Sequence, residues 1–301
     1  MKKVAVVSHD AGGAEILSSW LKMHSYNYLT VIDGPALGIF HKKNLFNNNY
    51  TLEEAIFESE FVLTSTSWQS DIEKRAISLS RKMDKYVITI LDHWVNYKDR
   101  FKLNSDIVLP NEIWVTDNYA LNIAKGIFND VKIKLIVNHH FSEIKKIIKE
   151  KSKLLKTGII HKSKCKCLFL GENISEHAFL ETGNSNGFGY DEIEALKYLL
   201  DNIEKIPIKF EELKIRPHPS EKENKYSWAL KNNLVSTISN SNDLIDDLLE
   251  SDVIFGCESI AMVIALIAKK KVISCIPNFV KKCSLPHSDI LNLGDLIKSE
   301  I

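Results

Sequence analysis

Leu213-Lys-Ile-Arg-Pro-His-Pro-Ser-Glu221 and, further along, Val253-Ile-Phe-Gly-Cys-Glu-Ser-Ile260 share one pattern. Each is a short apolar run that stops in a small polar cluster, and an apolar helix pattern follows the second. Open α/β sheets bind ligands at the carboxyl ends of their strands. The two stretches therefore predict adjacent strand ends that offer Arg216, His218, Glu258 and Ser259 to an anionic ligand.

The same alternation of strand and helix patterns runs through the first half of the chain. The expected strands are near-continuous apolar runs, which are typical of a parallel sheet covered on both faces. They are Val4–Val7, Leu29–Ile32, Phe61–Ser65, Tyr86–Leu91, Glu112–Thr116 and Val131–Val137. Between them, spacing of apolar residues predicts helices over Ala11–Met23, Leu52–Phe57, Asp71–Met83 and Tyr119–Phe128.

A lysine-rich segment, Glu143–Lys164, interrupts this alternation and is expected to form a connecting helix and linker. The alternation then restarts. Expected strands are Cys167–Leu170, Leu213–Arg216, Val235–Ile238, Val253–Phe255 and Val272–Ile276, and expected helices are Asp191–Ile203, Ser220–Leu230, Leu244–Leu249 and Ile260–Ala268. We therefore predict an α/β protein of two facing Rossmann-like domains, 1–145 and 165–301, joined by a linker over 146–164, with a ligand cleft between opposed strand ends.

Composition narrows the function. The chain has 301 residues and a formal net charge of zero, so it offers no overall electrostatic attraction to nucleic acid. Five cysteines, an odd number in a long chain, argue against a disulfide framework. The N-terminus lacks the pattern of a signal peptide, and no apolar run approaches the roughly 20 residues that span a bilayer, so a cytoplasmic protein is expected.

The first cluster that could carry chemistry is Ser8-His-Asp-Ala-Gly-Gly-Ala-Glu15, between the first strand and the first helix. Gly12 and Gly13 allow the backbone to approach a ligand closely, and a helix N-terminus favours anions. His9 and Asp10 are placed to act as a general base. The alternatives are a plain tight turn, with Asp10 capping the helix and His9 on the surface.

Two further clusters follow expected strands. Asp92, His93 and Trp94 open a loop that mixes carboxylates, cations and aromatic rings, which suits sugars; the alternative is a loop packed by Trp94 and Tyr97. Gly171-Glu-Asn-Ile-Ser-Glu176 places Glu172 and Asn173 at the first strand end of the second domain. Taken by itself, this second cluster is a weak signal.

The fourth cluster is the opening pair of stretches. Arg216 offers a fork of donors to phosphate oxygens, His218 can donate beside it, and Pro219 restricts the turn. Ser259 and the N–H groups of the next helix can bind phosphate, while Glu258 can accept from ribose hydroxyls or orient His218. The alternatives are a turn histidine and a Glu-Ser capping pair.

Arg216-Pro-His-Pro219 followed by Gly256-Cys-Glu-Ser259 resembles the His-Pro motif and the later serine motif of bacterial sialyltransferases and polysialyltransferases. Related motifs occur in capsule Kdo transferases and in glycerophosphotransferases of teichoic acid synthesis, and Leu170–Glu176 resembles the segment that opens their nucleotide domain. The resemblance implies a GT-B fold, with His218 on the donor phosphate and Ser259 near the donor's phosphate or carboxylate. Ile260 departs from the Ser or Thr usual after the serine, and the families' N-terminal acidic base motif has no match.

The sequence thus predicts a metal-independent glycosyltransferase without a cofactor, acting in capsule, lipopolysaccharide or other surface polysaccharide assembly. Its donor is a nucleotide sugar, such as a CMP-linked acidic sugar, and its acceptor a carbohydrate or glycolipid, with peripheral membrane association and no nucleic-acid partner. Donor contacts come from the second domain; Asp10 or His9 is the base, and Gly12, Gly13, Asp92, His93 and Trp94 lie on the acceptor side. The rivals are a nucleotide-sugar epimerase or hydrolase of the UDP-N-acetylglucosamine 2-epimerase type, and a non-catalytic two-domain binding protein.

Overall fold

Parallel strand pairing dominates both halves of the chain. The protein is described by a computed structural model covering residues 1–47, 50–68, 70–155, 165–241 and 243–298. It divides into two units, Met1–Glu143 (unit 1) and Ile144–Ile301 (unit 2). The predicted α/β class is confirmed, because each unit contains a six-stranded sheet in which every strand pair is parallel.

The sheet of unit 1 has the strand order β2-β1-β3-β4-β7-β8. Its strands are β1 (Lys3–Ser8), β2 (Asn27–Ile32), β3 (Phe61–Thr64), β4 (Tyr86–Ile90), β7 (Glu112–Val115) and β8 (Lys132–Leu135). The helices are α1 (Ala11–Lys22), α2 (Ala36–Lys42), α3 (Leu52–Glu58), α4 (Ile72–Lys82) and α5 (Asn118–Ile127), and a short hairpin joins β5 (Lys102–Leu103) to β6 (Asp106–Ile107). Helix α6 (His139–Leu155) begins in unit 1 and ends in unit 2.

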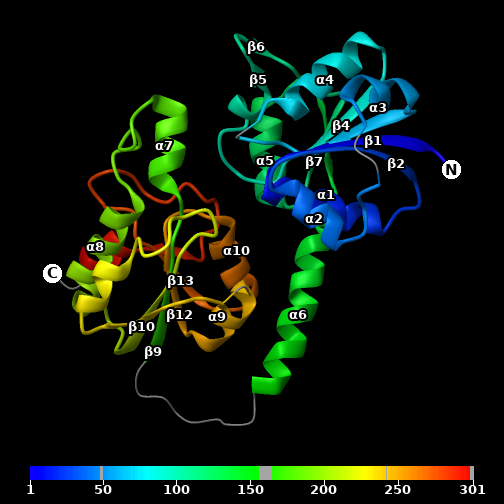
Figure 1. The fold of residues 1–301 in the computed structure, drawn as a ribbon. Helices are drawn as coiled ribbons and strands as arrows, with labels where there is room; N and C mark the ends of the chain where they lie inside the picture. Colours follow the sequence, from blue (N-terminus) through cyan, green and yellow to red (C-terminus); the bar gives the residue numbers. More distant parts are fainter. Residues whose placement is uncertain (48–49, 69, 156–164, 242, 299–301) are drawn as a thin grey trace. The chain divides into compact units, whose positions relative to one another are not determined.

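Helices cover both faces of this sheet, which is why its central strands are apolar throughout. Helices α1 and α2 lie on one face and α3 and α4 on the other (Figure 1). Burying a large apolar side chain contributes about 1.5–3 kcal/mol, so the core between the layers is the main source of stability. Its largest members on the α1 side include Ile16, Leu17, Trp20, Phe40 and Trp114. β8 departs from the expected apolar run, because this edge strand alternates lysine with apolar residues and is mostly exposed.

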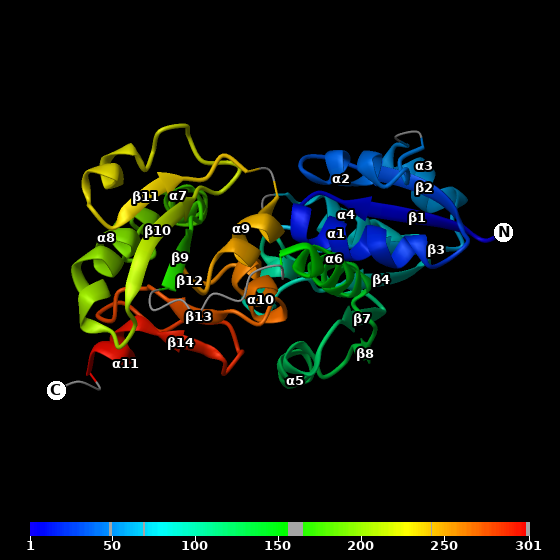
Figure 2. The same cartoon turned by 90° about the horizontal axis from the view of Figure 1, so that it is seen from below.

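The sheet of unit 2 has the order β11-β10-β9-β12-β13-β14. Its strands are β9 (Cys165–Leu170), β10 (Phe210–Arg216), β11 (Val235–Ile238), β12 (Val253–Gly256), β13 (Lys271–Ser274) and β14 (Ile290–Asn292). The helices are α7 (Ile174–Thr182), α8 (Glu192–Asn202), α9 (Leu244–Glu250), α10 (Ile260–Ile267) and α11 (Leu293–Lys298). Helices α8 and α11 cover one face and α9 and α10 the other (Figure 2).

Two expectations about unit 2 are wrong. The strands β10 and β12 are not neighbours, because β9 pairs with both of them and lies between. Ser220–Leu230 is not an α-helix; it consists of turns with a 3-10 helix only over Ser227–Lys231. Asn224 adopts a left-handed conformation (φ 64°), which interrupts any helix through this stretch.

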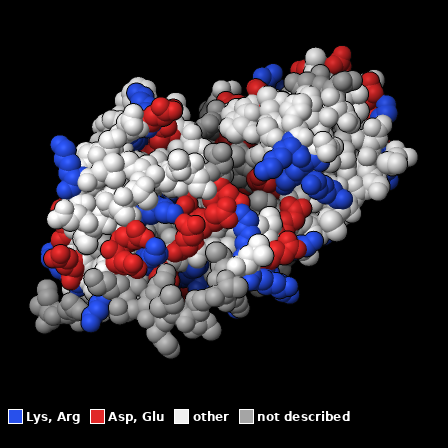
Figure 3. All heavy atoms as spheres, turned by 60° about the horizontal axis from the view of Figure 1, so that its bottom comes forward, with Lys and Arg blue, Asp and Glu red and all other residues white. Residues whose placement is uncertain are grey.

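The predicted linker, 146–164, overlaps α6 up to Leu155, and residues 156–164 lie outside the described residues. All five cysteines are free thiols and belong to unit 2. Among the described helices, none has the length and apolar character needed to cross a membrane. Acidic and basic side chains occur together over the face drawn in Figure 3, in keeping with the balanced net charge.

Candidate functional site

The carboxyl edge of each sheet contains a point where the chain leaves neighbouring strands in opposite directions, and such switch points are the usual ligand sites of open α/β sheets. In unit 1 the switch point lies between β1 and β3, because β2 continues on one side of β1 and β4 on the far side of β3. In unit 2 it lies between β9 and β12. We call the residues around these points the unit-1 site and the unit-2 site.

The unit-1 site is built on a histidine–carboxylate pair. Asp10 Oδ1 lies 2.7 Å from His9 Nδ1, and Asp10 Oδ2 accepts a hydrogen bond of 2.7 Å from the backbone N–H of Trp68. Asp10 holds the N-cap position of α1, but its side chain makes no capping hydrogen bond. Since a carboxylate only accepts, it favours a proton on Nδ1 and leaves the Nε2 lone pair to act as a base.

Glycines allow the surrounding backbone to close tightly on this pair. Gly34, at φ 53°, lies against the imidazole: a Cβ there would be 2.5 Å from His9 Nε2. A Cβ on Gly12 would be 2.6 Å from Asp92 Oδ2, and one on Gly13 would be 2.5 Å from Ser65 Cβ. Gly12 and Gly13 thus lie close to the protein's own side chains, and the predicted approach to a ligand stays a prediction.

Asp92 joins the unit-1 site through hydroxyl and guanidinium contacts. Its Oδ1 accepts from Thr66 Oγ1 at 2.8 Å and from Arg100 Nη1 at 2.9 Å. Arg100 is buried and also donates to Thr66 Oγ1 at 3.1 Å. The result is a cluster rich in carboxylates and hydroxyls. Its guanidinium, that of Arg100, is paired with Asp92.

Trp94 belongs to the packing of the loop after β4. It is buried, and its Nε1 donates to Asp117 Oδ2 at 2.7 Å. Tyr97 is also buried, which raises the pKa of its hydroxyl well above the usual range. These contacts favour the packed-loop alternative for Trp94, whereas His93 beside it is partly exposed.

The unit-2 site is centred on a carboxyl that caps a helix from outside. Glu172 Oε1 accepts from the backbone N–H groups of Cys257, Glu258 and Ser259 at 2.9, 3.0 and 3.1 Å, at the start of α10. Burial raises the pKa of Glu172 to about 7, although the N–H donors and the nearby Ser259 hydroxyl oppose the shift. Ser259 Oγ is itself buried and meets no partner at hydrogen-bond geometry among the described residues.

His218 occupies a rigid turn after β10. Its Nδ1 accepts from the backbone N–H of Ser220 at 3.3 Å and lies 2.7 Å from Ser220 Oγ, which favours a proton on Nε2. Its backbone N–H donates to Glu221 Oε2 at 2.6 Å, and Tyr226 holds the other oxygen of Glu221 at 2.7 Å. Burial and the neighbouring His177 lower the pKa of His218, so its neutral form prevails near neutral pH.

The structure brings Asn173 to the same turn. The Asn173 amide donates to Ser220 Oγ at 3.1 Å and also bonds Glu176. Asn173 is buried, whereas Pro219 between His218 and Ser220 is exposed. Loops from β9 and β10 are thus tied together at the carboxyl edge of the sheet.

Arg216 and Glu258 have other partners than the sequence suggested. Arg216 Nη1 donates to Asp247 Oδ2 at 2.5 Å and to the carbonyl of Ser241 at 3.0 Å. Glu258 pairs with Lys281 at 2.5 Å and accepts from the Ser284 N–H at 3.1 Å. Glu258 therefore does not orient His218 through any contact that the described residues make, and a phosphate role for Arg216 requires its ion pair to open.

Sequence reasoning missed the polar segment after β3 and the residues behind it. Thr66 and Trp68 contact Asp92 and Asp10, and Glu73 of α4 contacts the loop after β1. The signal was present, since the apolar run Phe61-Val-Leu63 ends in the polar cluster Thr64-Ser-Thr-Ser67. The same strand-end rule that selected His9 and His218 applies to it.

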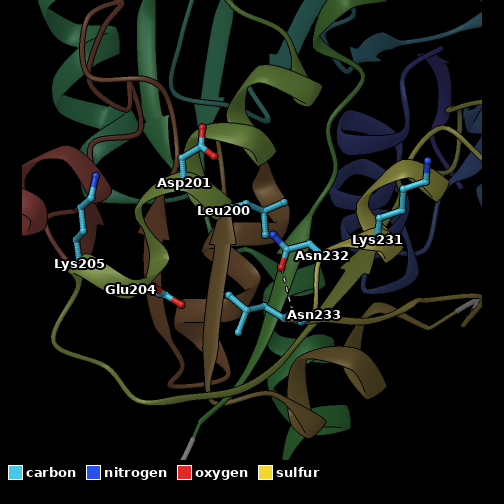
Figure 4. A pocket seen from close by; sticks show the side chains of 8 residues that line it. Leu200, Asp201, Glu204, Lys205, Lys231, Asn232 and Asn233 are labelled. Carbon is cyan, nitrogen blue, oxygen red and sulfur yellow. Dashed lines mark hydrogen bonds between the residues drawn. The ribbon is translucent and has the colours of Figure 1, made fainter.

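A hollow of about 610 Å³ lies at the opposite, amino edge of the unit-2 sheet, where α8 ends and β11 begins. Figure 4 shows its lining, in which Asn232 accepts from the backbone N–H of Leu234 at 2.9 Å. Two carboxylates, Asp201 and Glu204, and two ammonium groups, Lys205 and Lys231, balance each other there. The hollow lies at the amino edge of the sheet, not at the carboxyl edge where ligands usually bind, and its charges balance. Both features argue against a role in anion binding.

Comparison with known proteins supports the architecture. No protein-family model matches the chain, and no curated protein matches it in sequence. Among solved structures, UDP-GlcNAc 2-epimerase from Methanocaldococcus jannaschii matches at 16% identity over 99% of this chain and 92% of that one, with a TM-score of 0.58. HepE from Anabaena, solved with UDP and glucose, matches at 11% identity over 91% and 80%, with a TM-score of 0.54.

A further match, the wall teichoic acid polymerase TagF, has 13% identity over 91% of this chain and 69% of that one, and its TM-score of 0.39 is too low to carry weight. At these identities the likenesses show the fold alone. The fold is that of GT-B-type proteins with two Rossmann-like domains, as the sequence predicted.

Proposed function

We propose that the protein transfers a sugar from a nucleotide-sugar donor to a hydroxyl of a carbohydrate or glycolipid acceptor in surface polysaccharide or glycoconjugate assembly. The observation that carries this proposal is the opposite chemistry of the two switch points. The unit-2 site aims three backbone N–H groups at one anionic group, whereas the unit-1 site gathers a histidine, carboxylates and hydroxyls.

The donor phosphate would be held at the unit-2 site. Phosphate oxygens and carboxylate oxygens accept the same N–H donors, so the group that now accepts them, Glu172, marks a cradle of suitable geometry. His218 would donate from Nε2 to the leaving phosphate, and Ser259 Oγ would supply a further contact. Positioned donors stabilise the charge that develops as the nucleotide leaves.

The unit-1 site would supply the base. His9 Nε2 takes the proton from the acceptor hydroxyl, whose oxygen forms the new bond to the anomeric carbon as the bond to phosphate breaks. Asp10 holds the imidazole and stabilises its charged form. Carboxylates such as Asp10 and Asp92 repel a phosphate but accept hydrogen bonds from sugar hydroxyls, which supports placing the acceptor here.

A second candidate is a nucleotide-sugar epimerase. It is favoured by the full-length fold match to the archaeal UDP-GlcNAc 2-epimerase, which spans nearly all of both chains. The same residues would then act on the sugar of the bound nucleotide without an acceptor. For transfer, the starting hypothesis for the donor is a CMP-linked acidic sugar.

Thermal unfolding in the presence of CMP, UDP, GDP and CDP, and then of the matching nucleotide sugars, tests the proposal. The correct nucleotide stabilises the native state by mass action, and the others do so less. Transfer predicts nucleotide release that depends on an added acceptor, whereas epimerisation predicts an isomerised nucleotide sugar and no acceptor dependence.

The variant His218→Ala separates donor binding from the fold. We expect it to unfold at nearly the wild-type temperature and to bind the best nucleotide at least about tenfold more weakly, the equivalent of one charge-assisted hydrogen bond. His41→Ala, which removes an exposed histidine of α2, serves as the control. Equal nucleotide affinity and turnover in His218→Ala and the wild type would leave His218 as a turn residue only.

A further inference from the structure

Glu73 is a buried carboxyl at the centre of the unit-1 site. It is the second residue of α4, and only 1% of it is exposed. It lies between the ends of β1 and β3, where it contacts the His9 backbone and the Ser65 side chain. It belongs to none of the sequence motifs and has no part in the proposed transfer reaction.

The two oxygens of Glu73 have unequal surroundings. Oε1 accepts from the His9 N–H at 2.9 Å and from Ser65 Oγ at 3.0 Å, and Ser65 Oγ in turn lies 2.7 Å from Ser8 Oγ. Oε2 is buried and meets no hydrogen-bond partner among the described residues. Two donors on one oxygen and none on the other is the arrangement suited to a carboxylic acid, whose carbonyl oxygen accepts and whose hydroxyl carries the proton.

The environment agrees with an uncharged form. Burial raises the pKa of Glu73 above its ordinary value, while its contacts with backbone N–H groups and Ser65 only partly oppose the shift. Ser67 Oγ donates its hydrogen to the carbonyl of Ser70 at 3.0 Å. It therefore has no hydrogen left to donate to Oε2 of Glu73, in line with the lack of a donor there.

We propose that Glu73 is the positioning residue of the unit-1 site, a neutral acid whose carbonyl oxygen fixes the backbone of His9 and joins the ends of β1 and β3. Its role in turnover rests on the proposed function of His9, whereas its protonation state and its hold on His9 do not. The pair formed by His9 and Asp10 is anchored at two points, Trp68 N–H through Asp10 and Glu73 through the His9 backbone.

Few charged groups on nearby elements act on the protonation of Glu73. On its own helix Lys74 pairs with Asp71 at 2.7 Å, and in the loop after β1 Asp10 pairs with His9. The loop after β4 contributes the pair Asp92–Arg100. The titratable groups on the other elements packed on α4 are Glu53, Glu54 and Glu58 on α3, Lys3 on β1, Tyr86 on β4 and Lys102 on β5.

The test compares Glu73→Gln and Glu73→Ala with the wild type. Gln keeps a carbonyl oxygen for His9 and Ser65 and puts an uncharged NH2 in place of the carboxyl hydroxyl. An acid whose native pKa is raised binds more protons when folded, so its stability contribution is full below the unfolded pKa and declines as the pH rises toward the native pKa. Glu73→Gln should therefore match the wild type near pH 4.5 and become the more stable of the two at pH 7.5 and above.

Ring nitrogen chemical shifts of His9, measured by NMR across the same pH range, report its position directly. We expect Glu73→Gln to leave the His9 tautomer and its titration unchanged and Glu73→Ala to alter both. If transfer is observed, turnover falls about 10²-fold in Glu73→Ala, the scale of a misplaced catalytic group, and stays within about twofold in Glu73→Gln. The control is Glu53→Gln, which neutralises an exposed glutamate on α3.

Loss of stability in Glu73→Gln at every pH, with a disturbed His9 spectrum, would overturn the proposal and assign an ionised carboxylate. An Ala variant that fails to fold leaves the Gln comparison decisive. If no nucleotide sugar is turned over by the wild type, the proposed function fails while the stability and NMR results still decide the role of Glu73.

Discussion

The unit-1 and unit-2 sites occupy the same topological position and use it for opposite chemistry. In unit 2 a carboxyl meets backbone N–H groups at the start of α10, so the fold itself supplies the donors. In unit 1 the contacts join mainly side chains, and Asp92 lies over Gly12 at the start of α1. The same topological position therefore offers backbone N–H donors in unit 2 and side-chain acceptors in unit 1, because different side chains cover the helix end.

The largest change in turnover is expected from substitutions at the unit-1 site. His9→Ala or Asp10→Asn should lower turnover about 10²- to 10⁴-fold, the usual contribution of a general base, with little change in nucleotide affinity. Calorimetry with the best nucleotide and steady-state kinetics measure the two quantities separately. His41→Ala serves again as the control.

Full turnover in both variants would move the base to Asp92 or His93. Loss of nucleotide binding in both would make the loop after β1 a phosphate cradle and reverse the assignment of the two sites. That result would also favour the epimerase.

A smaller effect concerns Arg216, which the sequence placed on the phosphate. Asp247 is buried, and Arg216 is its closest charged partner, so Arg216→Met should destabilise unit 2 by about 3 kcal/mol. Nucleotide affinity per folded molecule should stay unchanged. Denaturant unfolding and calorimetry test the two halves of this prediction.

The double variant Arg216→Met with Asp247→Leu is the matched control, because removing both charges restores part of the lost stability. A single variant that is stable but binds nucleotide poorly would contradict the structural role. Arg216 would then belong to the unit-2 site after all.

The smallest change is expected in the nucleotide affinity of the unit-2 site. If the donor phosphate takes the N–H groups that Glu172 now holds, Glu172→Gln should bind the nucleotide a few-fold more tightly than the wild type at pH 8, where the carboxyl is ionised. Since the pKa of Glu172 is raised to about 7, the difference should shrink toward none at pH 6. The ratio of the two affinities cancels the titration of the phosphate itself.

Glu211→Gln, which neutralises an exposed glutamate near the start of β10, is the control for this comparison. Weaker binding by Glu172→Gln at every pH would mean that the carboxyl shapes the cradle or contacts the donor. The direct donor contact that the sequence suggested would then be the better assignment.

Local patterns predicted most of the fold. Apolar runs located the strands β1, β3, β4, β9 and β12 to within a few residues, because buried parallel strands are apolar on both faces. The strand order could not be predicted. The central position of β9 depends on the direction of the crossover connections, and no local sequence pattern indicates that direction. The prediction of a helix over Ser220–Leu230 was wrong, because one left-handed residue, Asn224, interrupts the helix despite the helical spacing of its apolar residues.

The sites were predictable only where they follow strands. His9, Glu172 and His218 come within two residues of the ends of β1, β9 and β10, and the strand-end rule finds them. Glu73 escapes that rule, because a glutamate in the first turn of a helix is usually a surface residue that favours the helix dipole. Only the packing of α4 against the strands buries it. The partner of Arg216 was equally hidden, since Asp247 lies on a different element, α9.

The uneven distribution of two residue types gives each unit its own native reporter. Trp20, Trp68, Trp94 and Trp114 belong to unit 1 and Trp228 alone to unit 2, whereas all five cysteines belong to unit 2. Indole fluorescence during unfolding is therefore weighted toward the first unit, while labelling of the buried thiols Cys167, Cys257 and Cys275 reports opening of the second. The stabilities of the two units become separable in one unlabelled chain, and a nucleotide that binds at the unit-2 site should protect thiols before it changes the fluorescence transition.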